Sequence, residues 1–166
     1  MSVSSHDRAE APIGLQPTTT EDLATLRSWE QDGDTRGWLG DTSLGWHERA
    51  LTDPDQRHLV AVRDARPVGF VVLAGLERSD HLIELRRIVV SPVERGNGVG
   101  RALLRAAVAR AAQHDSGATL WLDVKDDNSR AQALYLSEGF AFIAPPAHLG
   151  TPPADLLFME RLPSVL

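Results

Sequence analysis

The chain has no cysteine among its 166 residues, and this absence excludes disulfide bonds, thiol nucleophiles and thiolate metal sites together. Aromatic residues are scarce, at 5% of the chain, and there is a single tyrosine. Long hydrophobic runs are also missing, because the longest, residues 68–76, is far shorter than the roughly 20 residues that a membrane-spanning helix needs. We therefore expect no membrane association and a cytoplasmic location.

Positively charged residues are also fewer than negatively charged ones. The chain has 17 lysines and arginines against 23 aspartates and glutamates, which gives a formal net charge of -6. This balance argues against a nucleic-acid partner, since nucleic-acid binders normally present a basic face. An acidic surface is compatible with a cationic substrate, and solubility explains it equally well. The six histidines are scattered without the spacing of metal ligands, so we expect no metal.

The length suits one domain with a proper core. Residues 1–12 are polar and lack the apolar stretch of a secretory signal, so we expect residues 1–10 to be a loose tail before a single domain over residues 11–166. Residues 32–42 are rich in glycine and acidic residues and are expected to form a loop. The predicted strands are residues 13–18, 58–63, 68–76, 82–90, 118–124, 140–144 and 155–162, and the predicted helices begin at Thr20, Leu44, the glycines near residue 98, and Asn128.

Aromatic residues gather in one early stretch of the chain. Trp29, Trp38 and Trp46 lie there, with His47 beside the last of them. Such residues can form the wall of a substrate pocket, although aromatic side chains more often fill a core. We carry Trp38, Trp46 and His47 forward as candidate substrate-binding residues.

A glycine-rich loop follows the predicted strand that ends at residue 90. Glycines at positions 96, 98 and 100 free the backbone, and a helix pattern begins directly after them, so N–H groups and the positive end of a helix dipole converge on one spot. A Walker loop fails, because Arg101 stands where lysine is needed. A dinucleotide fingerprint fails too, since it needs a small residue at position 101 or 103. What remains is the spacing Arg-x-x-Gly-x-Gly from Arg95 to Gly100.

With that motif the chain resembles the GCN5-related N-acetyltransferase family, whose acyl-CoA signature is Gln/Arg-x-x-Gly-x-Gly/Ala. Two blocks carry the resemblance: residues 85–104, around the glycine loop, and residues 122–140, which include Asn128 and Tyr135. The resemblance implies an α/β (α+β) fold of the acyl-CoA N-acyltransferase type. That fold is a twisted, mixed and mostly antiparallel sheet with flanking helices and a parallel strand pair at the cofactor site.

The family resemblance also implies how acetyl-CoA is held. The pyrophosphate would lie on backbone N–H groups of the loop, with the Arg95 and Arg101 side chains adding charge, and the pantetheine arm would add like a strand beside the preceding strand. An N–H group of that strand, Val89 or Val90, would polarise the thioester carbonyl. Asn128 would contact the arm; the alternative is a helix cap, and one asparagine could serve both purposes. The implied cofactor-binding residues are Ile88, Val89, Val90, Arg95, Gly96, Asn97, Gly98, Val99, Gly100, Arg101, Asn128 and Tyr135.

Catalysis would need an acid and a base. By resemblance, Tyr135 protonates the departing thiolate; the alternative is a half-buried core aromatic. Glu84 and Asp123 are the candidate bases for the acceptor amine, with a proton relayed through water as the alternative. Strand alternation places Glu84 with Arg86, Ile88 and Val90 on one face unless a bulge intervenes, and pairing with an arginine is the alternative role for Glu84. Glu84 is also a candidate substrate-binding residue.

These observations predict direct transfer of an acetyl group from acetyl-CoA to a primary amine. A small cationic amine is the preferred acceptor, and a protein N-terminus or lysine is the nearest competitor. A non-catalytic acyl-CoA sensor is the alternative from another functional class. The sequence leaves open the acyl length and the oligomeric state, for which a homodimer is one candidate.

Overall fold

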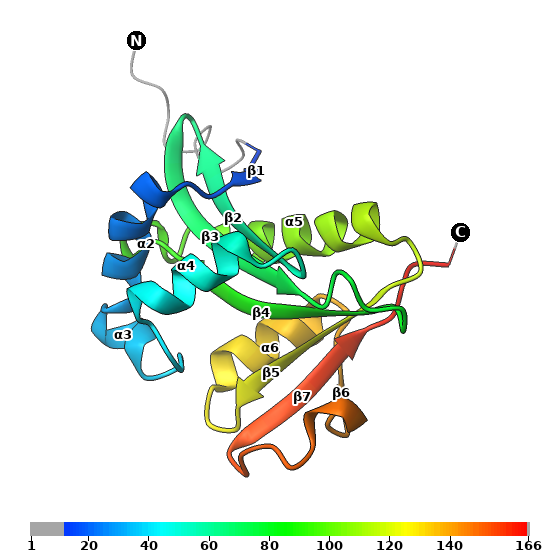
Figure 1. Cartoon of the computed structure of the whole chain (residues 1–166). Coiled ribbons are helices and arrows are strands. Elements are labelled where there is room, and N and C mark those ends of the chain that lie inside the picture. The colour runs from blue at the N-terminus through cyan, green and yellow to red at the C-terminus, as the bar shows by residue number, and fades with distance from the viewer. Residues whose placement is uncertain (1–11, 166) are drawn as a thin grey trace.

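A seven-stranded sheet with strand order β1-β2-β3-β4-β5-β7-β6 organises the fold (Figure 1). The computed structural model describes residues 12–165, so the tail expected at residues 1–10 lies outside the described residues. Every neighbouring strand pair is antiparallel except β4 and β5, which are parallel. The predicted mixed sheet with one parallel pair is therefore confirmed. The strands are β1 (Gly14–Pro17), β2 (Gln56–Arg63), β3 (Arg66–Ala74), β4 (Leu82–Val90), β5 (Thr119–Lys125), β6 (Ala141–Ile143) and β7 (Leu156–Arg161).

Helices cover both faces of the sheet (Figure 1). Two lie on one face, α5 (Val99–His114) and α6 (Ser129–Ser137), and their apolar sides form the larger core with the central strands. On the other face, α2 (Leu23–Glu30) and α4 (Leu44–Thr52) enclose a second cluster that includes Phe70 and Val89. Within residues 12–165, no helix has the length and apolar character to cross a membrane.

The stretch expected to be a loop at residues 32–42 contains a short helix, α3 (Gly33–Arg36). Asp32 caps it, because its carboxylate accepts a hydrogen bond from the Asp34 N–H at 3.2 Å. Glycine and acidic residues suggested a loop, but an aspartate before a single turn is also a good helix start. Three single turns of 3-10 helix complete the elements: η1 (Thr20–Asp22), η2 (Pro92–Glu94) and η3 (Ala147–Leu149).

Strand β4 contains a bulge at Arg86. The register against β3 passes from Leu85 opposite Leu73 to Arg87 opposite Val72, which leaves Arg86 without a partner. Beyond the bulge, the odd- and even-numbered residues of β4 therefore exchange the faces of the sheet toward which they point. Ile88 packs on the larger core, whereas Val89 belongs to the cluster under α2 and α4. The simple alternation that would place Glu84 on one face with Ile88 and Val90 is therefore broken.

Strands β4 and β5 pair over only three positions and then diverge (Figure 1). Their last paired residues are Glu84 and Trp121. On the other edge of β4, the Ser91 N–H donates to the Val68 carbonyl at 2.9 Å. Because the N–H groups of a strand point alternately to opposite sides, those of Ile88 and Val90 point away from β3, toward the side where β5 has diverged.

A buried polar network crosses the layer between the sheet and helices α2 and α4. The Glu30 carboxylate, fully buried, accepts from Arg87 Nη1 at 2.8 Å and lies 2.5 Å from His47 Nε2. His47 Nδ1 lies 2.9 Å from His58 Nε2. Burial, followed by the neighbouring His47, lowers the pKa of His58 to about 3, so this ring stays neutral. Trp46 completes the arrangement, with the Arg87 guanidinium carbon 3.7 Å from its ring centre.

The substitution Arg87→Leu should destabilise the protein by about 3–5 kcal/mol, because it leaves the buried Glu30 carboxylate without its cation. Urea unfolding followed by tryptophan fluorescence measures the change. The double variant Glu30→Leu with Arg87→Leu should recover part of the loss, since no unpaired charge remains. The control Arg105→Leu removes an exposed arginine and should leave the midpoint nearly unchanged. An Arg87 variant as stable as that control contradicts the assignment.

Candidate active site

The loop between η2 and α5 presents a row of backbone donors. Gly96 and Gly98 have φ values of 81° and 74°, and Gly98 is the N-cap of α5. The first helical bond is donated by Ala102 to the Gly98 carbonyl at 3.1 Å. Within the described part of the chain, no protein group accepts from the N–H groups of residues 96–101. A Cβ atom at Gly96 or Gly98 would meet nothing within 4 Å. The loop is therefore open and built to hold an anion.

The two arginines of the motif brace this loop from opposite sides. Arg95 Nη1 donates to the Asp32 carboxylate at 2.6 Å and its Nη2 donates to the Thr35 hydroxyl, which ties the loop to α3. Arg101 Nη1 donates to the Ser137 hydroxyl at 2.8 Å and also pairs with Glu138, which ties α5 to the end of α6. Carboxylates pair with both guanidinium groups, and the backbone N–H groups of the loop have no acceptor within residues 12–165.

Strand β4 and helix α6 lie directly against the loop. A Cβ atom at Gly100 would lie 3.7 Å from Val90 Cγ2 and 3.9 Å from Leu134 Cδ2, so this glycine contacts both elements. The loop at residues 96–101 and the strand edge at residues 88–90 therefore adjoin, as the motif predicted. Asn128 caps α6, because its Oδ1 accepts from the Ala131 N–H at 3.2 Å. The capping alternative is thus confirmed, and the side-chain amide N–H groups of Asn128 donate to no protein atom within residues 12–165.

Tyr135 projects from α6 into the larger core beside Phe140, with a distance of 5.7 Å between ring centres. The residue is 8% exposed, and its hydroxyl makes no hydrogen bond to a protein atom in the described structure. Burial, and then the charge of Asp123, raise the pKa of Tyr135 to about 12. The hydroxyl is accordingly protonated at neutral pH and has a proton to donate.

Two carboxylates lie where β4 and β5 separate. Glu84 Oε2 accepts from Arg86 Nε at 3.0 Å and from Nη2 at 2.7 Å. Asp123 lies two residues beyond the last paired residue of β5, and its side chain is accessible to solvent. Partial burial, followed by the charge of Glu84, raises the pKa of Asp123. Glu84, Asp123 and Tyr135 therefore form one electrostatically coupled group at the strand divergence.

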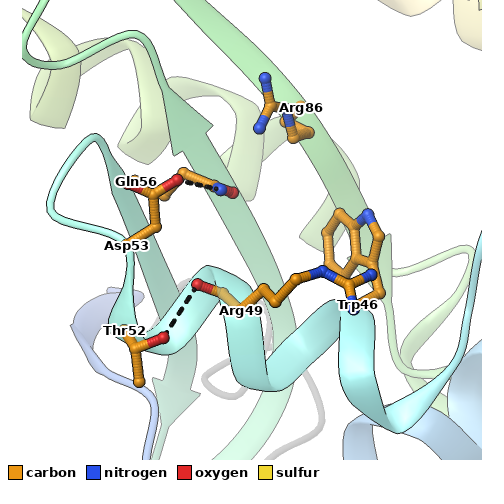
Figure 2. Close-up of a pocket in the computed structure, with 6 residues that line it drawn as sticks. All are labelled: Trp46, Arg49, Thr52, Asp53, Gln56 and Arg86. Atoms are coloured by element: carbon orange, nitrogen blue, oxygen red, sulfur yellow. Dashed lines mark hydrogen bonds between the residues drawn. The ribbon is translucent and has the colours of Figure 1, made fainter.

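Of the candidate acceptor residues, Trp46 lines a pocket beside α4. The pocket has a volume of about 390 Å³ and lies beside α4 (Figure 2). His47 was expected to line the acceptor pocket, and that prediction is wrong. Its ring is fully buried, because it bridges Glu30 and His58. Trp38 is 41% exposed and does not line this pocket. The lining residues are Trp46, Arg49, Thr52, Asp53, Gln56 and Arg86.

No sequence signal pointed to the other pocket residues. They come from α4, the turn after it, β2 and β4, and only the folded arrangement brings them together (Figure 2). A run of arginine, threonine and aspartate between a helix and a strand resembles any solvated turn. Among residues 12–165, no group of three or more histidine, aspartate or glutamate side chains is arranged to hold a metal ion.

Comparison with known proteins supports the family resemblance that the glycine motif indicated. Residues 20–140 match the acetyltransferase (GNAT) family. An uncharacterized N-acetyltransferase of Mycobacterium bovis is 38% identical over 91 residues, which are 54% of this chain and 56% of that protein. A mycothiol acetyltransferase of Jonesia denitrificans is 38% identical over 122 residues, covering 68% of this chain and 38% of that protein. The chain thus spans about half or less of the length of these relatives.

Solved structures share the architecture. The spermidine N-acetyltransferase of Vibrio cholerae, in complex with CoA and spermine, superposes with a TM-score of 0.73 over 90% of this chain and 95% of that one. The sequence identity between the two is 17%, so this likeness establishes the fold alone.

Because Tyr135 is the only tyrosine in the chain, its ionisation can be measured directly by ultraviolet absorbance. The midpoint should lie near pH 12, and the variant Asp123→Asn should lower it, since removal of a nearby negative charge favours the phenolate. The variant Asp64→Asn, at the β2–β3 turn, is the control and should leave the midpoint unchanged. Circular dichroism at each pH confirms that the protein is folded. A midpoint near 10 in folded protein contradicts the described environment.

Proposed function

Since the chain belongs to the GNAT acetyltransferase family, we propose that it transfers an acetyl group from acetyl-CoA directly to a primary amine. The observation that carries the proposal is the meeting of three features at one place: the open donor loop at residues 96–101, the unpaired edge of β4, and the protonated Tyr135. Each feature serves a different part of the same donor molecule.

The donor would lie along these features in order. Its pyrophosphate takes hydrogen bonds from the N–H groups of residues 96–101, at the positive end of the α5 dipole. The peptide-like pantetheine arm pairs with the N–H and C=O groups of Ile88 and Val90 that point away from β3. The parity of the strand favours Val90 over Val89 as the N–H that polarises the thioester carbonyl, because the Val89 N–H is directed toward β3. The unpaired amide of Asn128 supplies a further donor to the arm.

Direct transfer proceeds without a covalent enzyme intermediate. An acidic side chain, Asp123 or Glu84, first takes a proton from the acceptor ammonium. The amine lone pair then forms a C–N bond to the thioester carbon, and the oxygen that gains negative charge lies at the Val90 N–H. The C–S bond breaks as the carbonyl re-forms, the Tyr135 hydroxyl protonates the departing sulfur, and the nitrogen, which is positively charged after the attack, releases its second proton to solvent. Proton exchange with solvent then restores Tyr135 and the carboxylate, and the products are the N-acetyl amide and CoA.

A small molecule that presents a protonated primary amine is the proposed acceptor. The coupled carboxylates of Glu84 and Asp123 at the strand divergence favour a cation at the reacting end. A protein N-terminus or lysine is the competing acceptor. A non-catalytic acyl-CoA sensor is the alternative from another functional class, and it would need neither a general acid nor a base. We retain a homodimer and a cytoplasmic location as expectations.

The reaction is tested by measuring thiol release from acetyl-CoA across a panel of small amines, polyamines, aminoglycosides and peptides. At least one amine should be turned over, and Tyr135→Phe should lower kcat by about 10²-fold or more, the usual contribution of a general acid. CoA affinity, measured by calorimetry, should change little in this variant. Tight CoA binding without turnover of any amine would support the sensor instead.

The base is tested by the pH dependence of kcat/KM. Activity requires the ionised carboxylate, so the rate falls as the pH drops through the pKa of the base. Because burial and Glu84 raise the pKa of Asp123, the acidic limb should lie above the usual range of an aspartate. Asp123→Asn should abolish that limb, and Glu84→Gln should move it to lower pH by removing the neighbouring charge. An unaltered profile in both variants would leave water as the proton carrier.

A further inference from the structure

The pocket beside α4 is lined from three directions (Figure 2). Trp46, Arg49 and Thr52 come from α4, while Gln56 begins β2 and Arg86 is the bulged residue of β4. Its volume of about 390 Å³ lies within the range of sites that hold small molecules. Most of the lining side chains are polar, and they carry more positive than negative charge, whereas the chain as a whole is acidic.

Positive charge dominates this wall. Asp53 is its only acidic residue, and that carboxylate is already occupied: it accepts from the Gln56 side chain at 2.9 Å and from the Asp55 N–H at 2.9 Å. These hydrogen bonds, with a contribution from Arg86, lower the pKa of Asp53. Its two oxygens are therefore held by its own turn and by the start of β2, and the carboxylate keeps its negative charge.

The two arginines keep donors available. Arg86 uses Nε and Nη2 on Glu84, so its Nη1 donates to no protein atom within residues 12–165. Arg49 makes no hydrogen bond to a carboxylate in that range, because the Asp41 oxygen lies 3.6 Å away and both side chains are more than half exposed. The guanidinium of Arg49 lies over Gly45, where a Cβ atom would come within 3.2 Å of Nη1. The missing side chain at Gly45 leaves it room.

Arg86 also connects the pocket to the reaction centre. It contacts Glu84, and the charge of Glu84 is felt by Asp123 at the strand divergence. The acidic surface at the carboxylates therefore adjoins the basic surface at the guanidinium groups, with the Glu84–Arg86 ion pair between them. A ligand that spans it would place a cation beside the carboxylates and an anion beside the guanidinium groups.

We propose that the acceptor carries an anionic group, such as a carboxylate, and that Arg49 and the Nη1 of Arg86 bind it in this pocket. The proposal rests on the acetyltransferase function argued above and narrows its acceptor to a small molecule with an amine at one end and an anion at the other. Trp46, Thr52, Asp53 and Gln56 provide the remaining wall. A polyamine, which is cationic at both ends, is disfavoured here by the two arginines.

The test uses matched acceptors that differ only at the far end. We choose ω-amino acids of increasing chain length, from 3-aminopropanoate to 6-aminohexanoate, each with its neutral ω-amino amide and the corresponding diamine. For the best chain length, kcat/KM of the carboxylate should exceed that of the amide by about 10-fold, the effect expected of a charge-assisted hydrogen bond. In Arg49→Gln this ratio should fall toward one. Arg110→Gln, which removes an arginine of α5 on the opposite face of the sheet, should keep the wild-type ratio.

A second readout does not depend on turnover. Hexanoate, which has no amine, should quench or shift tryptophan fluorescence through Trp46 in the wild-type protein and in Arg110→Gln, but not in Arg49→Gln. Equal kcat/KM for carboxylate and amide, or a preference for the diamine, would overturn the anion site while leaving the acetyltransferase function intact. If no amine in any series releases CoA but hexanoate still binds through Arg49, the acetyltransferase function fails and the anion site survives without it.

Discussion

The pairing of Arg87 with Glu30 is the interaction on which the geometry of the site depends. It joins β4 to α2 across 57 residues of sequence, inside a layer that excludes water. A buried ion pair is stable only when its remaining polar atoms are also satisfied. Here His47 takes the second carboxylate oxygen of Glu30, and the Asp41 carbonyl accepts from the second guanidinium nitrogen of Arg87 at 2.9 Å. The pair therefore fixes β4 directly beyond its bulge.

The bulge in β4 and the short parallel pairing of β4 with β5 determine which groups border the proposed site. Because β5 leaves β4 after Glu84, the edge of β4 at Ile88 and Val90 is not used by the sheet. A continuous seven-stranded sheet would have no backbone donors for a peptide-like ligand in its centre. Asp123 lies at the same divergence, and its charge contributes to the raised pKa of Tyr135, so the proposed general acid and its electrostatic environment both depend on one irregularity of the fold.

Much of this was predictable from sequence, and the failures have physical reasons. The glycine loop, Asn128 and Tyr135 became candidates because their spacing along the chain is itself the signal, and their roles at the cofactor stay predictions. His47 was misplaced, because a histidine beside a tryptophan looks the same whether it faces a ligand or a buried glutamate. The role of Glu30 was missed, since the arginine that justifies its burial is distant in sequence. The pocket at Arg49 and Arg86 was also missed, because its residues come together only in three dimensions.

In the proposed function an acidic chain binds two anionic groups, and the arginines differ between the two places. Near the donor loop, carboxylates pair with Arg95 and Arg101, while the backbone N–H groups of the loop have no acceptor within residues 12–165, so we propose these N–H groups and the helix dipole for the pyrophosphate. Near the proposed acceptor pocket, Arg49 lies 3.6 Å from the Asp41 carboxylate in an exposed ion pair, and Arg86 donates Nε and Nη2 to Glu84 while its Nη1 has no acceptor in the described structure. An exposed ion pair contributes little to stability, so a ligand anion can compete for Arg49. Net charge therefore says little about either proposed site, because what a ligand meets is set by the donors that the protein leaves unused.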